Sequence, residues 1–252
     1  MIIGVPKEIK LQEHRIGLTP DSVKILTNKG HEVLVQDNGG FEAGFTNENY
    51  KNAGAKIIEK PEEIFKNSEI IVKVKEPLMS EVKMIRENQI VYTYLHLAAA
   101  KELTEGLIKT KSICIAYETV TDDNGRLPLL APMSAVAGRM SIQAGAHSLE
   151  KNQKGRGLLL GGAPGVEPAN VVILGGGVVG ENAAIIATGM KGKVYVVDKS
   201  KERLKELHEM FGDKIIPTQS DKTDLKKLVI DCDLLVGGVL IPGAEAPKLV
   251  TK

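Results

Sequence analysis

The chain has 252 residues, with 33 Lys and Arg against 32 Asp and Glu, so its formal net charge is +1 when the histidines are neutral. Apolar residues make up 42% and charged residues 26% of the chain. This composition is ordinary for a globular protein and excludes intrinsic disorder, which requires low hydrophobicity and high net charge. The balanced charge also excludes a protein that binds nucleic acid through a basic surplus. At about 150 residues per domain, the length predicts two domains, and one large α/β domain is the alternative.

The sequence lacks the features of a membrane protein, a secreted protein and a zinc protein. No run of about 18 apolar residues is present to span a membrane. The N-terminal sequence MIIGVPKEIK lacks the basic segment and apolar stretch of a signal peptide. Cys114 and Cys232 lie in strand-like apolar runs, which is typical of buried thiols in a reducing compartment, and no Cys/His cluster has zinc spacing. We expect a soluble, cytoplasmic protein without a metal site and without a nucleic-acid or membrane partner.

The first half of the chain alternates between strand-like and helical segments. Strands are expected at residues 1–5, 32–36, 70–74, 90–95 and 113–117. The helices between them have start and stop signals: Pro20 takes the first helical position after Thr19, Gly30 ends that helix, and Ser80 is the expected cap of another. This alternation predicts a parallel sheet with helices on both faces.

The second half of the chain repeats this pattern after a linking helix. A turn cluster at 122–125 precedes a helix expected at 128–150, which is rich in small residues and therefore able to pack closely. Strands are then expected at 170–174 and 193–197, near Ile215, and at 233–236, with helices at 178–190, 201–211 and 222–230. The pattern predicts an α/β fold of two doubly wound parallel-sheet lobes that divide near residue 130.

A glycine motif lies in the second lobe. The apolar run 171–174 is followed at once by GGGVVG at 175–180, and a helix is expected to begin inside it. This is G-x-G-x-x-G in the strand–turn–helix context that dinucleotide binding requires. Gly175 would make the sharp turn, Gly177 would let the backbone approach a pyrophosphate, and Gly180 would let the helix pack on the strand. The helix N-terminus would offer N–H groups and a positive dipole end to the phosphates.

An acidic residue indicates which dinucleotide is preferred. Asp198 ends the next expected strand, 23 residues after Gly175. A carboxylate there accepts hydrogen bonds from a ribose diol and repels the 2′-phosphate of NADP, which predicts NAD. Lys199 and Arg203 lie nearby and leave NADP open, because a cation could bind a 2′-phosphate. A glycine turn in a sheet without ligand is the alternative interpretation of the motif.

Six short segments carry a resemblance to a known family. They are GVPKEIK at 4–10, EHRIGLTP at 13–20, GGFEAGF at 39–45, VKVKEP at 72–77, YLHLA at 94–98 and APMS at 131–134. Together they resemble the alanine dehydrogenase family, which is related to the alpha subunit of nicotinamide nucleotide transhydrogenase. The last three segments favour alanine dehydrogenase. The resemblance also implies that the last third of the family's length is lacking. That third would include two of the six strands of the dinucleotide-binding lobe and a catalytic aspartate.

The resemblance implies a reaction and three residues that carry it. The reaction is the reversible, NAD-dependent oxidative deamination of L-alanine to pyruvate and ammonium. Arg15 and Lys75 would bind the substrate, since a guanidinium can clamp a carboxylate with two hydrogen bonds and an ammonium can polarise a keto or imine group. His96 would be the catalytic residue, because an imidazole with a pKa of about 6.5 suits proton transfer.

The motif and the resemblance together predict where the cofactor binds, since ligands of doubly wound sheets lie beyond the carboxyl ends of the strands. The expected cofactor-binding residues are Ser134, Gly175, Gly177, Val178, Val179, Gly180, Asp198, Arg203, Ser220, Val239 and Leu240. Residues 1–130 would then form the substrate and catalytic lobe, and residues 131–252 an incomplete NAD-binding Rossmann lobe. The family implies a homo-oligomer, usually a hexamer. A catalytically inactive NAD-binding remnant and a transhydrogenase-like hydride exchange between NADH and NADP remain the alternatives.

Overall fold

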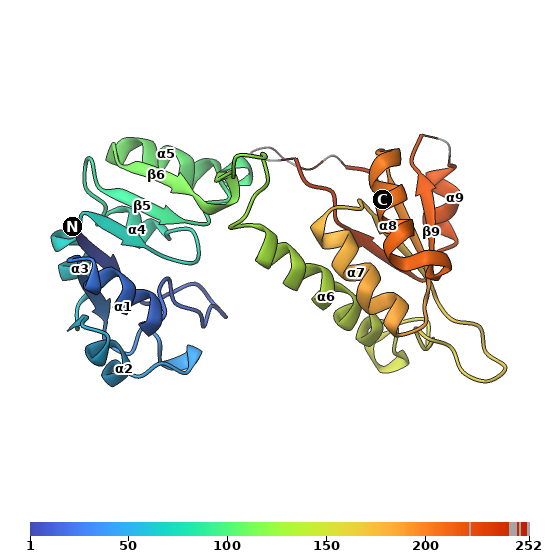
Figure 1. Ribbon diagram of the computed structural model, residues 1–252, viewed down its shortest axis with the longest axis horizontal. Coiled ribbons are helices and arrows are strands. Elements are labelled where there is room, and N and C mark those ends of the chain that lie inside the picture. The colour runs from blue at the N-terminus through green and yellow to red at the C-terminus, as the bar shows by residue number, and fades with distance from the viewer. Residues whose placement is uncertain (222, 242–245, 247, 251–252) are drawn as a thin grey trace. The chain divides into compact units, whose positions relative to one another are not determined.

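The computed structural model describes residues 1–221, 223–241, 246 and 248–250. The chain divides into two compact units, Met1–Leu127 and Pro128–Lys252, and each is described by itself (Figure 1). Among the described residues, no helix is both long enough and apolar enough to span a membrane.

The first unit is built on a six-stranded parallel sheet. Its strands are β1 (Ile2–Val5), β2 (Glu32–Gln36), β3 (Lys56–Ile58), β4 (Ile70–Val72), β5 (Ile90–Thr93) and β6 (Ile113–Ala116). Their order, β3-β2-β1-β4-β5-β6, is that of the doubly wound dinucleotide-binding fold. The sequence predicts five of these strands and misses β3, which has three residues and pairs with β2 through Leu34–Lys56, Val35–Ile57 and Gln36–Ile58.

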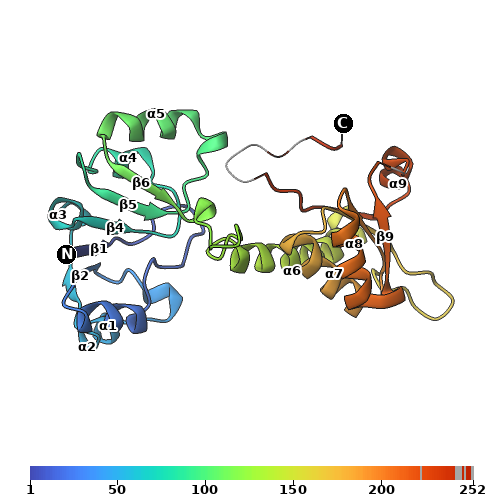
Figure 2. The same cartoon turned by 45° about the horizontal axis from the view of Figure 1, so that its top comes forward.

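Helices cover both faces of this sheet, as Figure 2 shows for α5 on one side and α1 and α2 on the other. They are α1 (Pro20–Asn28), α2 (Asn47–Asn52), α3 (Pro61–Asn67), α4 (Met79–Val82) and α5 (Lys101–Thr110), with 3-10 turns η1 (Phe41–Ala43), η2 (Leu97–Ala99) and η3 (Tyr117–Thr119). The predicted start of α1 is confirmed, because the Thr19 side chain accepts a hydrogen bond from the Ser22 N–H. The expected cap at Ser80 is wrong: Leu78 is the capping position of α4, and the Glu81 carboxylate accepts its N–H at 2.9 Å.

Alternate residues of the strands supply two separate cores, one on each face of the sheet. Along β4, Val72 belongs to the core that also contains Val23 of α1 and Tyr50 of α2. Its neighbour Ile71 belongs to the core with Leu107 of α5. Successive side chains of a strand point to opposite faces, so a strand that is apolar throughout is buried on both sides. The helices on both faces therefore position the loops at the carboxyl edge of the sheet.

The second unit has a four-stranded parallel sheet in the order β10-β7-β8-β9. Its strands are β7 (Asn170–Leu174), β8 (Lys193–Asp198), β9 (Ile215–Gln219) and β10 (Leu234–Gly237). Its helices are α6 (Ala131–Ser148), α7 (Val178–Gly189), α8 (Lys201–Phe211) and α9 (Leu225–Ile230), with 3-10 turns η4 (Lys151–Gln153) and η5 (Gly212–Lys214). The order corresponds to the first four strands of the doubly wound fold. The sequence places the start of the last helix at Lys222, which lies outside the described residues.

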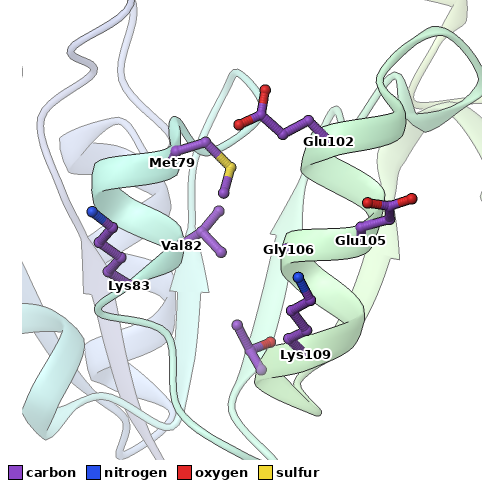
Figure 3. A pocket seen from close by; sticks show the side chains of 8 residues that line it. Met79, Val82, Lys83, Glu102, Glu105, Gly106 and Lys109 are labelled. Carbon is purple, nitrogen blue, oxygen red and sulfur yellow. The ribbon is translucent and has the colours of Figure 1, made fainter.

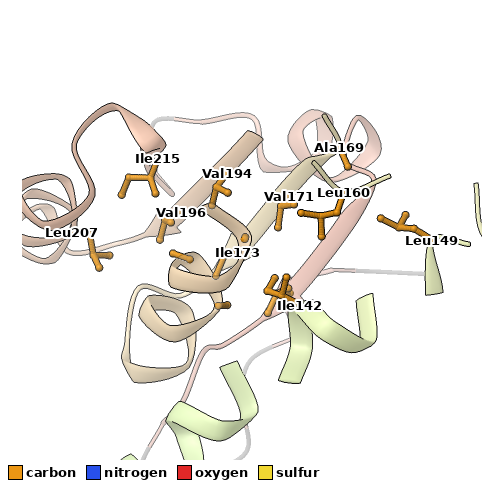
Figure 4. Close-up of a cluster of buried hydrophobic side chains, with 14 residues drawn as sticks. Ile142, Leu149, Leu160, Ala169, Val171, Ile173, Val194, Val196, Leu207 and Ile215 are labelled. Atoms are coloured by element: carbon orange, nitrogen blue, oxygen red, sulfur yellow. The ribbon is translucent and has the colours of Figure 1, made fainter. Parts of the chain in front are cut away.

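Helix α6 packs closely on α7 and on the sheet. A side chain at Gly138 would place its Cβ 2.2 Å from the Val179 carbonyl oxygen, so only glycine allows the two helices to approach this far. Ile142 of α6 is fully buried and joins Ile173 of β7 and Val196 of β8 in one core (Figure 4). The small residues of α6 therefore attach this helix to the dinucleotide-type sheet.

Candidate functional site

The residues predicted to bind substrate gather where the strands of the first sheet end. The carboxyl ends of parallel strands meet at one edge of a sheet. The expected strands at 70–74 and 90–95 would place Lys75 and His96 directly at strand ends, and these strand bounds are wrong. Strand β4 ends at Val72 and β5 at Thr93, so both residues lie in the loops beyond the strands.

A buried ionic cluster supports the loop that carries Lys75. The Lys73 side chain is only 1% exposed, and its Nζ lies 3.0 Å from Glu8 Oε2 and 2.8 Å from Glu81 Oε1. The other Glu8 oxygen accepts the Val74 N–H at 2.6 Å and the Lys75 N–H at 3.3 Å. Glu8 therefore connects the loop after β1 to the loop after β4. The sequence did not predict this cluster, although Glu8 and Lys73 lie in segments that carry the resemblance.

Glu76 lies between three basic side chains. Its carboxylate is bonded to the Lys10 ammonium, its Oε2 lies 4.0 Å from Lys75 Nζ, and the same oxygen lies 3.2 Å from Nδ1 of His96. Burial raises the pKa of Glu76, but the hydrogen bond from Lys10 and the charges of Lys10 and Lys75 lower it by more. The net shift is downward, so the carboxylate stays ionised next to the histidine.

His96 has an unusual backbone conformation. Its φ of 51° and ψ of 37° lie in the left-handed region, which is uncommon for residues other than glycine. The Glu118 carboxylate, from η3 after β6, accepts the His96 N–H at 2.6 Å and the Leu95 N–H at 3.0 Å. The imidazole is half exposed and stacks on Tyr94, with ring centroids 6.1 Å apart. The backbone thus places the histidine ring at the surface of the site.

Arg15 is oriented by a neighbouring carboxylate. Its Nε and Nη2 donate to the two oxygens of Glu13 at 2.7 and 2.6 Å. The hydrogen bond from Arg15 lowers the pKa of Glu13 to about 2, and the charge of Lys75 contributes to the same shift. Arg15 also acts electrostatically on Tyr94, whose pKa is raised chiefly by burial. The pair of Arg15 and Glu13 therefore lies near Lys75 and Tyr94, and Lys75 and His96 both contact Glu76, so the three predicted residues lie at one edge of the sheet.

The glycines of the loop in the second unit have two different roles. Two of them are required by the fold, and a third has free space around it. Gly175 has a φ of +97° and makes the turn after β7. A Cβ at Gly180 would lie 1.9 Å from the Gly175 carbonyl oxygen, so α7 packs on the strand end only with glycine there. At Gly177, by contrast, a Cβ would meet no atom within 4 Å. The backbone at Gly177 is therefore accessible, and it lies directly before the N-terminus of α7.

Asp198 and Arg203 hold Gly176 from two sides. Oδ2 of Asp198 accepts the Gly176 N–H at 2.6 Å, and Nε of Arg203 donates to the Gly176 carbonyl at 2.7 Å. The Arg203 guanidinium is also bonded to Glu181 and to Glu206. Burial lowers the pKa of Arg203, but these two glutamates raise it by more. Arg203 thus belongs to the scaffold of the loop in this structure.

The remaining predicted cofactor residues take the following places. Ser134 lies in the first turn of α6, and Val178 and Val179 are the first two residues of α7 rather than loop residues. Ser220 follows β9, where its N–H is bonded to the Asp198 carbonyl at 3.0 Å. Val239 and Leu240 follow β10. All of these except Ser134 lie at the carboxyl edge of the second sheet.

A separate groove of about 360 Å³ lies between α4 and α5 (Figure 3). Met79, Val82 and Gly106 form its apolar part, and side chains of both charges surround it, Lys83 and Glu102 among them. None of the predicted site residues lines this groove. Within the described residues, no group of three or more His, Cys, Asp or Glu side chains is placed to hold a metal ion.

Comparison with known proteins identifies the family. The model of the alanine dehydrogenase/PNT N-terminal domain matches residues 4–137, and that of the C-terminal domain matches residues 141–252. The chain belongs to the alanine dehydrogenase/PNT family. It is 52% identical over 252 residues to an alanine dehydrogenase of Methanococcus maripaludis, covering all of this chain and 68% of that relative.

Solved structures agree with this assignment. A structure of an L-alanine dehydrogenase superposes with a TM-score of 0.89 at 49% identity and covers all of this chain and 69% of its own. A transhydrogenase from Sinorhizobium meliloti superposes with a TM-score of 0.77 over 99% of this chain and 73% of its own. At 23% identity, the transhydrogenase shares the fold alone.

Proposed function

We propose that this protein is an NAD-dependent oxidoreductase that converts L-alanine, NAD⁺ and water into pyruvate, ammonium, NADH and a proton, and catalyses the reverse reaction. The observation that carries the proposal is the convergence of Arg15, Lys75 and His96 at one edge of the first sheet, in a chain that is 52% identical to an alanine dehydrogenase. The transhydrogenase alternative has weaker support, because that relative is only 23% identical.

The three residues divide the chemistry of the substrate among them. Arg15 binds the carboxylate, because Glu13 already orients its planar guanidinium. The Lys75 ammonium would contact the nitrogen or oxygen on the reacting carbon and polarise it. The alanine ammonium first loses a proton to solvent, which allows the hydride to leave and the iminium to form. His96 then takes a proton from the water that adds to the iminium carbon and returns it to the amine nitrogen, which departs as ammonia. In the direction of amination, the same groups act in reverse.

The second unit fits a nicotinamide dinucleotide. The open space at Gly177 admits a pyrophosphate to the N-terminus of α7, and the neighbouring glycines hold the loop that allows this approach. The proposed contacts to the dinucleotide are Ser134, Gly175, Gly177, Val178, Val179, Gly180, Asp198, Arg203, Ser220, Val239 and Leu240. When bound, the nicotinamide supplies the acceptor for the hydride from the alanine Cα.

NAD, rather than NADP, is the dinucleotide that the charges around this loop favour. The Asp198 carboxylate lies at the end of β8 and repels a 2′-phosphate. Arg203 could attract one, but its guanidinium is engaged by Glu181, Glu206 and the Gly176 carbonyl. We further propose that residues 1–130 form the catalytic lobe and 131–252 the cofactor lobe of a cytoplasmic homo-oligomer, as the hexamers of the family suggest.

The test is the formation of NADH from L-alanine and NAD⁺, followed by absorbance, with His96→Ala as the variant and His147→Ala of α6 as the matched control. We expect turnover by the unmodified chain and the control, and its loss in His96→Ala. Retained turnover in His96→Ala would refute the role of the histidine. NADH binding by fluorescence without turnover would support the inactive-remnant alternative, and hydride exchange without alanine would support the transhydrogenase alternative.

A further inference from the structure

We propose that Glu76 is a positioning residue that holds the His96 imidazole in one tautomer, with the proton on Nδ1 and with Nε2 as the nitrogen that exchanges protons in the reaction. This inference deepens the proposed function and rests on it for the role of His96. The observation behind it is the contact of 3.2 Å between His96 Nδ1 and Glu76 Oε2.

The tautomer follows from the chemistry of the two groups. A neutral imidazole has one N–H donor and one acceptor nitrogen, whereas an ionised carboxylate can only accept hydrogen bonds. The nitrogen that contacts Glu76 must therefore carry the proton. Nε2 of His96 is then left with its lone pair, which is the form that a general base requires. A carboxylate behind Nδ1 also stabilises the imidazolium that forms when Nε2 takes up a proton.

The surroundings of Glu76 keep it ionised and in place. Its side chain is 17% exposed, and its Oε1 is bonded to the Lys10 ammonium. Lys75 Nζ lies 4.0 Å from Oε2, the oxygen that faces the histidine. Burial raises the pKa of Glu76, but the hydrogen bond from Lys10, a backbone hydrogen bond and the charges of Lys10 and Lys75 together lower it by more. The carboxylate therefore remains an acceptor at the pH values where a histidine exchanges protons.

Two other histidines of the chain contact glutamates in a different setting. His14 is bonded to Glu42 with side chains 62% and 51% exposed, and His147 Nδ1 lies 3.3 Å from Glu150 with side chains 61% and 51% exposed. Exposed pairs of this kind are screened by water and contribute little. The Glu76 carboxylate is much less exposed than either of these glutamates, so it can constrain a ring. Glu150 consequently provides a matched control.

The test is nitrogen-15 NMR of the full chain with labelled histidines, recorded at about pH 8, where an ordinary imidazole is neutral. The variants are Glu76→Gln, Glu76→Asp and Glu150→Gln. We expect His96 to show the Nδ1–H form in the unmodified chain and in Glu150→Gln. In Glu76→Gln the amide can donate as well as accept, so the Nε2–H form should appear. Glu76→Asp should restore part of the Nδ1–H signal.

Kinetics of the same variants provide the second readout. Glu76→Gln should lower kcat for alanine by about 100-fold, with a smaller change in KM and unchanged binding of NADH, and Glu76→Asp should recover part of kcat. An Nε2–H form in the unmodified chain, or a tautomer that Glu76→Gln leaves unaltered, would overturn the proposal. If Glu76→Gln does not fold, the tautomer of His96 in the unmodified chain still tests the proposal, which requires the Nδ1–H form. Absence of turnover in the unmodified chain would refute the proposed function instead, since the tautomer is measured without catalysis.

Discussion

The Glu118 carboxylate accepts the main-chain N–H of His96 at 2.6 Å, so a residue from the segment after β6 fixes the backbone of a residue after β5. The same carboxylate accepts the N–H of Leu95, which is almost fully buried. Both N–H groups would lose their partner if the carboxylate were removed. His96 has a left-handed backbone conformation, which costs a residue other than glycine about 1–3 kcal/mol of conformational free energy. The hydrogen bond to Glu118 therefore also helps to keep His96 in this conformation.

We therefore predict that Glu118→Ala lowers both stability and activity. The hydrogen bond from Leu95 is partly buried, whereas the one from His96 is exposed. Leaving a buried donor without a partner costs about 1–3 kcal/mol, so the free energy of unfolding in urea should fall by about 1–2 kcal/mol. Turnover should fall further than stability explains, since the imidazole is no longer held in place. Glu102→Ala, on the surface of α5, is the control and should change neither quantity. Full turnover in a folded Glu118→Ala variant would contradict the prediction.

The glycine loop gives a prediction that separates folding from binding. Gly177→Ala adds a methyl group where no atom lies within 4 Å, so the only expected cost to stability is that of alanine at the N-cap of α7, about 1 kcal/mol or less. The same methyl group lies in the space proposed for the pyrophosphate, and NADH binding by fluorescence should weaken at least 10-fold, about 1.4 kcal/mol. Gly180→Ala should instead destabilise the unit, because its Cβ would lie 1.9 Å from a carbonyl oxygen. Equal NADH affinity in Gly177→Ala would place the cofactor elsewhere.

The sequence pattern predicts most strands but not where each of them ends. The alternation of apolar segments predicts every strand except β3, which has only three residues, none of them fully buried. The run from 70 to 74 looks like one strand, yet β4 ends at Val72. Beyond it, the Val74 N–H is taken by the Glu8 carboxylate, 66 positions away. The local sequence pattern does not reveal that the Val74 N–H bonds to a side chain, because this bond forms only when the loops after β1 and β4 come together.

The sequence proposes the candidate site residues that belong to motifs, and their roles stay predictions. Gly175 and Gly180 follow from a strand and a helix that flank them, and Arg15, Lys75 and His96 follow from the family resemblance. Glu76 and Glu118 were not predicted. Glu76 lies in the VKVKEP segment and Glu118 lies outside all six segments, but in neither case does the sequence show that the glutamate contacts His96 or its backbone. Their contacts with His96 span 20 and 22 positions. These contacts become visible only in the folded structure, where the carboxyl ends of the parallel strands lie side by side.

The buried lysine provides a prediction about stability. Lys73 is the only described side chain whose ammonium bonds to both Glu8 and Glu81, and all three side chains are at most 4% exposed. Lys73→Met would leave two carboxylates without their cation, and removal of one partner from a buried ion pair costs about 3–5 kcal/mol. Urea unfolding at neutral pH should show a loss of this size. Lys56→Met breaks the exposed pair with Glu32 and should cost about 1 kcal/mol or less. Similar losses in both variants would contradict the role of burial.

The pair of Glu13 and Arg15 predicts a pH dependence of stability. The hydrogen bond from Arg15 lowers the pKa of Glu13 in the folded chain from its ordinary value of 4.5 to about 2. A group whose pKa is lowered by folding stabilises the folded state fully above its unfolded pKa. This stabilisation should therefore be complete above about pH 5 and should be lost as the pH falls towards 2. Glu13→Gln should be less stable than the unmodified chain at neutral pH, and the two should converge near pH 2. Urea unfolding measured across this range, with exposed Glu59→Gln as control, tests the prediction, and a constant difference between the two curves would contradict it.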